Sequence, residues 1–127
     1  MAGFEKQVFV DYLKAHVSKS PFGEGMCARH VRLALAAGGV RPTHWPIAAK
    51  DWGATLSVAG FRTVPPHGYH PKLADIAVMQ TTSESKYGHI EGYNGSHWIS
   101  DFVQRDFWPG PSFRHEKPLY QIYRWPT

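Results

Sequence analysis

Apolar residues recur at helical spacing near the start of the chain, with charged residues between them. A stripe of this kind predicts an amphipathic helix that packs one face on a core. The helix should cover residues 4–17, and its apolar positions are Phe4, Val8, Tyr12 and Leu13. A loop rich in Ser, Pro and Gly, residues 18–25, separates this helix from the next element.

A second helix is predicted directly after this loop. In the segment MCARHVRLALAA, Ala28, Val31 and Leu35 fall on one face. Gly38 and Gly39 then favour the end of the helix. Cys27 should therefore lie in the first turn. A third, shorter helix is predicted over residues 47–59, although the glycine within it weakens that prediction.

The pattern changes beyond residue 60 to short runs rich in β-branched and aromatic residues, which predict strands. The predicted strands are residues 61–64, 76–79, 89–93, 97–100 and 120–124. Asn94-Gly95 between two of these runs predicts an antiparallel hairpin. Helices followed by strands predict an α+β fold, with helices packed on one face of a small antiparallel sheet.

Composition is consistent with one globular domain over residues 1–127. Hydrophobic residues make up 43% of the chain and charged residues 19%, unlike a disordered protein. The net charge of +4 favours an anionic partner, such as cell wall, nucleic acid or lipid headgroups, without choosing among them. No phosphate-binding glycine loop or nucleic-acid motif is recognised, so we expect no nucleic-acid partner.

Two further properties concern the compartment in which the protein works. The chain has one cysteine, so an intrachain disulfide is excluded and Cys27 is free for chemistry. The N-terminal residues mix acidic, basic and apolar types, unlike the continuous apolar core of a signal peptide. No later stretch has the length of a membrane span. We therefore expect synthesis in the cytoplasm without a signal peptide.

Cys27 and His89 together predict nucleophilic catalysis. A cysteine attacks a carbonyl as its thiolate, which the positive end of a helix and a nearby imidazolium stabilise. Cys27 has the helix position, and the free N–H groups of the same turn point where an oxyanion would form. His89, on a predicted strand after Gly88, supplies a base. A lone cysteine is otherwise a small buried apolar residue.

These residues carry a resemblance to a known superfamily. The segments GMCARHVR around Cys27, GHIEGY around His89 and WISD ending at Asp101 resemble the NlpC-type and CHAP-type cysteine peptidases and amidases. The resemblance covers about residues 20–124, and it implies a papain-like core. It also implies that Cys27 is the nucleophile, His89 the base and Asp101 the polar third residue that orients the histidine.

The third residue has two candidates. Glu91 lies two positions after His89 on the same strand and faces the same side of the sheet. Its carboxylate would lie beside the imidazole. Asp101 returns across the predicted hairpin and could accept the Nδ1–H of His89 from behind. We favour Asp101 for orientation, and Glu91 for contact with the substrate.

The resemblance implies a hydrolase that cuts an amide bond of peptidoglycan, in the stem peptide or in a crosslink. Small size and the absence of wall-binding repeats are similar to amidase effectors of type VI secretion and to phage lysin domains. The implied partners are peptidoglycan and a cognate immunity or secretion protein, and the site of action is the cell wall, in a target periplasm or outside the cell. A non-wall amide or acyl substrate and a non-catalytic wall-binding module stay open.

Aromatic residues are further candidates for the substrate groove. Trp52 and the loop containing Trp108 could form its walls, although tryptophans more often belong to a core. The scattered histidines, including His30, His67 and His70, match no zinc spacing, so we expect no metal and no cofactor.

Overall fold

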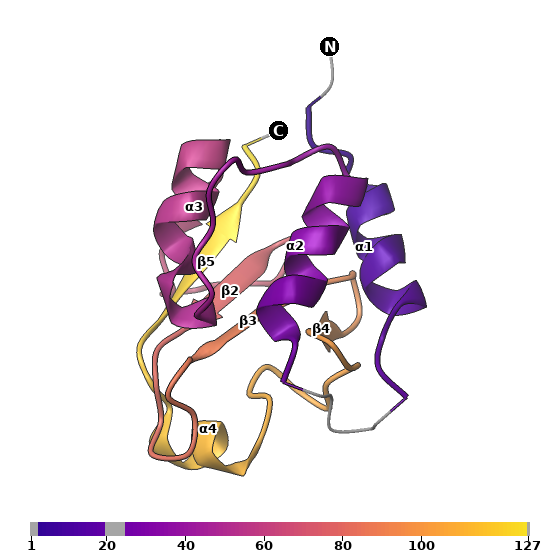
Figure 1. Cartoon of the computed structure of the whole chain (residues 1–127). Helices are drawn as coiled ribbons and strands as arrows, with labels where there is room; N and C mark the ends of the chain where they lie inside the picture. Colours follow the sequence, from indigo (N-terminus) through magenta and orange to yellow (C-terminus); the bar gives the residue numbers. More distant parts are fainter. Residues whose placement is uncertain (1–2, 20–24, 127) are drawn as a thin grey trace.

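The computed structural model describes residues 3–19 and 25–126 (Figure 1). The helices are α1 (Lys6–Ala15), α2 (Cys27–Ala37), α3 (Trp52–Ala59) and α4 (Pro111–Glu116), and a short 3₁₀ turn, η1 (Ala49–Asp51), precedes α3. The strands are β1 (Arg62–Val64), β2 (Ile76–Met79), β3 (His89–Tyr93), β4 (Trp98–Ile99) and β5 (Tyr120–Arg124). None of the described helices is long and apolar enough to cross a membrane.

The strands form one antiparallel sheet in the order β1-β5-β2-β3-β4. The last strand of the chain thus lies between β1 and β2, near the centre of the sheet. In the register of β2 and β3, Met79 pairs with His89. All four residues of β2 are buried, so β3 pairs with a strand that lies inside the core.

Helices α1, α2 and α3 cover one face of the sheet, as the order of elements predicts (Figure 1). Phe9 and Leu13 of α1 are fully buried against this face. Gly92 of β3 permits their close approach, because a Cβ atom there would lie 2.7 Å from Leu13 Cδ1. The sheet contributes to the same core through Ile76, Val78, Ile90, Ile99 and Tyr123.

The opposite face of the sheet carries a smaller apolar cluster. Ala77, Trp98 and Ile122 form its buried centre, and Phe107 packs against it from the segment that joins β4 to β5. This segment contains α4, which the sequence pattern did not predict. Its helix has six residues and begins at a proline between glycine and serine, so its pattern is typical of a loop.

The predicted strands 76–79, 89–93 and 120–124 are confirmed with the bounds of β2, β3 and β5. The hairpin at Asn94-Gly95 is also confirmed, because β3 and β4 pair on either side of it. The predicted third helix is divided into η1 and α3. Helix α1 is shorter than the predicted 4–17 at both ends.

A buried ion pair ties β5 to the turn before β2. The Asp75 side chain is fully buried, and Arg124 donates to both of its oxygens at 2.8 Å. Tyr69 Oη donates to Asp75 Oδ2 at 2.6 Å, and the backbone N–H of Lys72 donates to the same oxygen at 3.0 Å. Four hydrogen bonds to this carboxylate therefore help to fix β5 beside the turn before β2.

Asp75→Ala should destabilise the fold by about 2–3 kcal/mol, because it leaves a partly buried guanidinium and a phenol without their acceptor. Urea unfolding followed by circular dichroism measures the change. The matched control is Asp11→Ala on α1, where an exposed carboxylate accepts from Gln7, and it should cost about 0.5 kcal/mol or less. Equal midpoints for both variants would contradict this account of Asp75.

Candidate active site

Cys27 is the first residue of α2, as the sequence predicts, and its side chain is half-buried. It lines a pocket of about 320 Å³ together with His89 and Phe113. The two residues predicted to react with the substrate therefore face one cavity. At a helix start the backbone N–H groups lack helical acceptors, so they are available to a developing oxyanion at this pocket.

Asp101 also lines this pocket and is buried. Its Oδ2 accepts a hydrogen bond of 2.9 Å from the backbone N–H of Met26, the residue that precedes α2. Its own carbonyl accepts from the N–H of Ser18 at 2.7 Å. These contacts connect the end of the β3–β4 hairpin to both sides of the loop before Cys27. They place Asp101 against the start of the helix that carries Cys27.

The backbone conformation and close packing at position 88 require a glycine before the histidine. Its φ of +70° is a backbone conformation that favours glycine. A Cβ atom there would also lie 2.3 Å from the carbonyl oxygen of Met79 and 2.7 Å from Lys50 Cβ. Only a residue without a side chain lets the chain enter β3 so close to β2, with His89 as the first residue of the strand.

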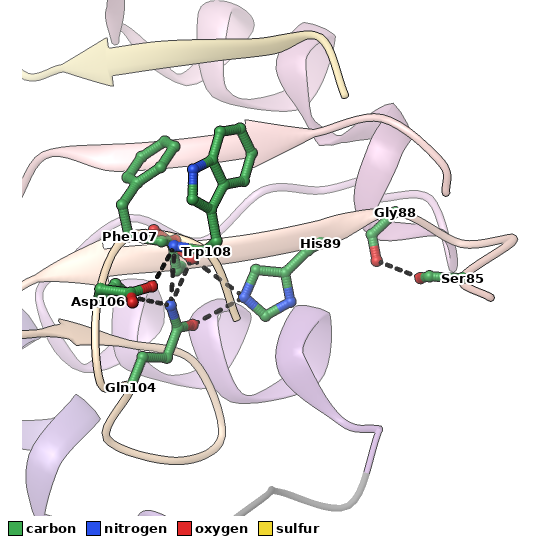
Figure 2. Close-up of polar contacts among 8 residues, drawn as sticks. Ser85, Gly88, His89, Gln104, Asp106, Phe107 and Trp108 are labelled. Atoms are coloured by element: carbon green, nitrogen blue, oxygen red, sulfur yellow. Dashed lines mark hydrogen bonds and ion pairs between the residues drawn. The ribbon is translucent and has the colours of Figure 1, made fainter. Parts of the chain in front are cut away.

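The imidazole of His89 is held by two buried side chains (Figure 2). His89 Nε2 lies 2.8 Å from Gln104 Oε1 and 3.2 Å from Glu91 Oε1. Gln104 Nε2 in turn donates to Glu91 Oε1 at 2.8 Å. Glu91 lies on the same side of β3 as His89, two residues later, whereas Gln104 comes from the segment after β4.

The surroundings of Gln104 fix the direction of its amide. Its Nε2 also faces the backbone carbonyl oxygens of Asp106 at 3.1 Å and Phe107 at 3.3 Å, as Figure 2 shows. Because these groups and the Glu91 carboxylate are acceptors, the amide NH₂ must point toward them and Oε1 toward His89. His89 Nε2 therefore carries a hydrogen, which leaves Nδ1 for the thiol.

The charges of the site are coupled through His89. Burial opposes a charged imidazole, but hydrogen bonds to Cys27 and Glu91 outweigh it and raise the pKa of His89 above its ordinary value. Burial raises the pKa of Glu91 to about 7, against the hydrogen bonds of His89 and Gln104. Glu91 Oε2 is buried without a hydrogen-bond partner among the described residues, which agrees with a raised pKa of this carboxyl group.

The predicted substrate contacts need correction. Trp52 and Glu91 are fully buried, so neither can touch a substrate. Trp52 belongs to the helix-covered core and donates its Nε1–H to the carbonyl of Pro46 at 3.2 Å. Trp108 packs against the rings of Phe107 and Tyr120 on the other face. The loop that contains Trp108 lines the pocket through Pro109 and Gly110 instead.

The remaining histidines lie apart from this chemistry. His30 is buried and donates its Nε2–H to the carbonyl of Leu13 at 2.8 Å, which joins α2 to α1. His67 and His70 line a separate pocket of about 290 Å³ near Arg124. Within residues 3–19 and 25–126, no group of three His, Cys, Asp or Glu residues is arranged to hold a metal ion.

Sequence reasoning did not find Gln104. It lies in the run FVQRDFWPG, where no periodic pattern or motif distinguishes it from a solvated loop glutamine. Its importance depends on the fold, which buries it to an exposed fraction of 2% beneath β3. The sequence signal that was available concerns its partner Glu91. Strand alternation places this acid, two positions after the histidine, beside the imidazole.

Comparison with known proteins identifies a family. No protein-family model and no curated protein sequence matches the chain. Two crystal structures of the type VI effector–immunity complex Tae3–Tai3 from Ralstonia pickettii do match. The native complex is 36% identical with a TM-score of 0.85, covering 96% of this chain and 99% of that chain. The selenomethionine form is 36% identical with a TM-score of 0.83, covering 91% and 98%.

Identity at this level over nearly the whole of both chains extends well beyond a shared fold. The structures that match are those of type VI secretion effectors. This chain belongs to the Tae3 family of these effectors.

The geometry predicts that Cys27→Ala lowers the pKa of His89, because the variant removes a hydrogen bond and an electrostatic interaction that favour the charged ring. The chemical shift of the His89 ring, followed by NMR across a pH titration, measures the effect. Glu91→Gln should move the pKa in the same direction. An unchanged His89 titration in both variants would show that neither group is coupled to the imidazole.

Proposed function

We propose that this protein is an antibacterial type VI effector that hydrolyses an amide bond of peptidoglycan, with Cys27 as nucleophile and His89 as acid and base. The observation that carries the proposal is the pairing of these two residues at one pocket, Cys27 opening α2 and His89 opening β3. Membership of the Tae3 family supports it.

The mechanism is acyl transfer. The Cys27 thiolate attacks the carbonyl carbon of the amide, and the first free N–H groups of α2 stabilise the oxyanion. As the C–N bond breaks, the His89 imidazolium donates its proton to the leaving amine. A water molecule, deprotonated by His89, then attacks the thioester, which releases the carboxylic acid and restores the Cys27 thiolate and the His89 imidazolium.

Gln104 and Glu91 fill the orienting role in this mechanism. Both contact the Nε2 side of His89, and the amide of Gln104 can point in only one direction. This assignment replaces the sequence-based preference for Asp101. The carboxylate of Asp101 instead accepts from Met26 N–H, and we give it the task of placing the start of α2.

The order of the two reactive elements also supports a papain-like core of the NlpC and CHAP type. A nucleophile that opens a helix and a histidine that opens a strand of an antiparallel sheet are the features that this resemblance implies. The polar residue behind the histidine is then Gln104, whose carboxamide holds the ring.

A cognate immunity protein is the proposed protein partner, and peptidoglycan the proposed substrate. The Tae3 structures contain their effector with the immunity protein Tai3. The proposed site of action is the cell wall of a target cell. The protein should therefore cause lysis when it is sent to the periplasm and no harm where peptidoglycan is absent.

Cys27→Ala should abolish the release of soluble fragments from purified sacculi, because no other cysteine is available on the chain. Chromatography and mass spectrometry of the digest measure this loss and identify the bond that is cut. The control is Ser57→Ala, an exposed position on α3 away from the pocket, which should digest sacculi normally. The same products from Cys27→Ala as from wild type would refute cysteine catalysis.

A further inference from the structure

Two polar side chains hold one edge of the His89 ring, but they do not fix its plane. Gln104 and Glu91 both contact the ring at Nε2. The torsion that turns a histidine ring about its Cβ–Cγ bond is soft. Such a turn moves Nδ1, the nitrogen that the proposed mechanism pairs with Cys27. A further side chain packed against the ring is therefore needed to keep Nδ1 in place.

Phe113 of α4 packs against the imidazole of His89. The centroids of the two rings are 5.7 Å apart and their planes meet at 58°, within the range of favourable aromatic pairs. Both residues are buried, and both line the catalytic pocket together with Cys27. A bulky, stiff ring at this distance restricts the space in which the imidazole can turn.

Helix α4 is tied to the segment that carries Gln104. Arg114 Nε donates to Asp106 Oδ2 at 3.2 Å. The backbone carbonyl of Asp106 in turn accepts from Gln104 Nε2 at 3.1 Å. Gln104 and Phe113, which contact the imidazole at different places, are therefore connected to each other through Asp106.

Helix α4 is also held against the loop that leads into β3. The backbone N–H of Ser83 donates to both carboxylate oxygens of Glu116, at 3.0 and 3.2 Å, and the Ser83 hydroxyl donates to the same carboxylate. Thr82 Oγ1 and Ser112 Oγ lie 2.9 Å apart. Neither Ser83 nor Glu116 lines the catalytic pocket, so a substitution at Glu116 changes the support of α4 and leaves the pocket lining intact.

We propose that Phe113 is a positioning residue, which holds the plane of the His89 ring so that Nδ1 stays available to Cys27. This inference rests on the proposed function, in which His89 forms the reactive pair with Cys27. Phe113 acts through the imidazole in this role. The loss of Phe113 should therefore matter only while His89 is present.

The test measures how much His89 accelerates the alkylation of Cys27 by iodoacetamide at neutral pH. This acceleration is the ratio of the rate constant of a protein with His89 to that of the same protein with His89→Ala. Because both proteins give the reagent the same access past position 113, the ratio isolates the coupling between the two residues. Phe113→Ala should lower the ratio about tenfold, since the ring is no longer held. Phe113→Leu keeps an apolar side chain of similar size and should stay within about threefold of wild type.

Glu116→Ala tests the same role from outside the pocket, and it decides the question if circular dichroism shows that Phe113→Ala does not fold. It removes the acceptor of Ser83, so α4 is held less firmly and the ratio should fall about threefold. Glu116→Gln keeps an acceptor oxygen and should keep the wild-type ratio. The control is Glu5→Ala, at an exposed position before α1, which should also keep it.

A wild-type ratio in folded Phe113→Ala would overturn the role of Phe113, because any change in alkylation would then not pass through the imidazole. If Phe113→Ala is unfolded, a wild-type ratio in Glu116→Ala overturns it instead. Either result leaves the proposed function standing, since the digestion of sacculi is measured separately. Failure of wild type to digest sacculi, or digestion by Cys27→Ala, would contradict the proposed function itself.

Discussion

The buried carboxamide of Gln104 is the interaction on which the site depends. Its NH₂ group is surrounded by the Glu91 carboxylate and two backbone carbonyls, so its oxygen has one possible direction, toward His89. A hydroxyl could turn to suit either tautomer, whereas this amide accepts only from Nε2–H. The fold thereby selects the tautomer that leaves Nδ1 without a hydrogen, and the proposed proton transfers with Cys27 use that nitrogen.

The rest of the fold brings three separate segments to this point. Strand alternation puts His89 and Glu91 on one side of β3, and Gly88 allows the strand to begin tightly against β2. The segment after β4 returns beneath the strand with Gln104. Asp101 meanwhile binds the backbone just before α2. Cys27, His89 and Gln104 are thus linked by the β3–β4 hairpin and the residues that follow it, which pack on the buried core.

Sequence patterns predicted the supporting fold more completely than the site. The strands 76–79, 89–93 and 120–124 and the start of α2 follow from local periodicity and turn residues, which act within a few positions. The pairing of Cys27 with His89 was expected from their chemistry and from the family resemblance, and the structure places both at one pocket. Gln104 could not be found, because its role depends on burial by distant segments. Trp52 was assigned to the groove, because a sequence pattern does not distinguish a tryptophan in the core from one that lines a substrate groove.

The central claim is that Gln104 holds His89 against Cys27, and the alkylation rate of Cys27 by iodoacetamide at neutral pH tests it most directly. The account predicts rapid alkylation of wild type and slow alkylation of His89→Ala, since the imidazole stabilises the reactive thiolate. Gln104→Ala should also be slow, whereas Asp101→Asn, which can still accept from Met26 N–H, should stay close to wild type. Wild-type rates in Gln104→Ala, with a large loss in Asp101→Asn, would contradict the account.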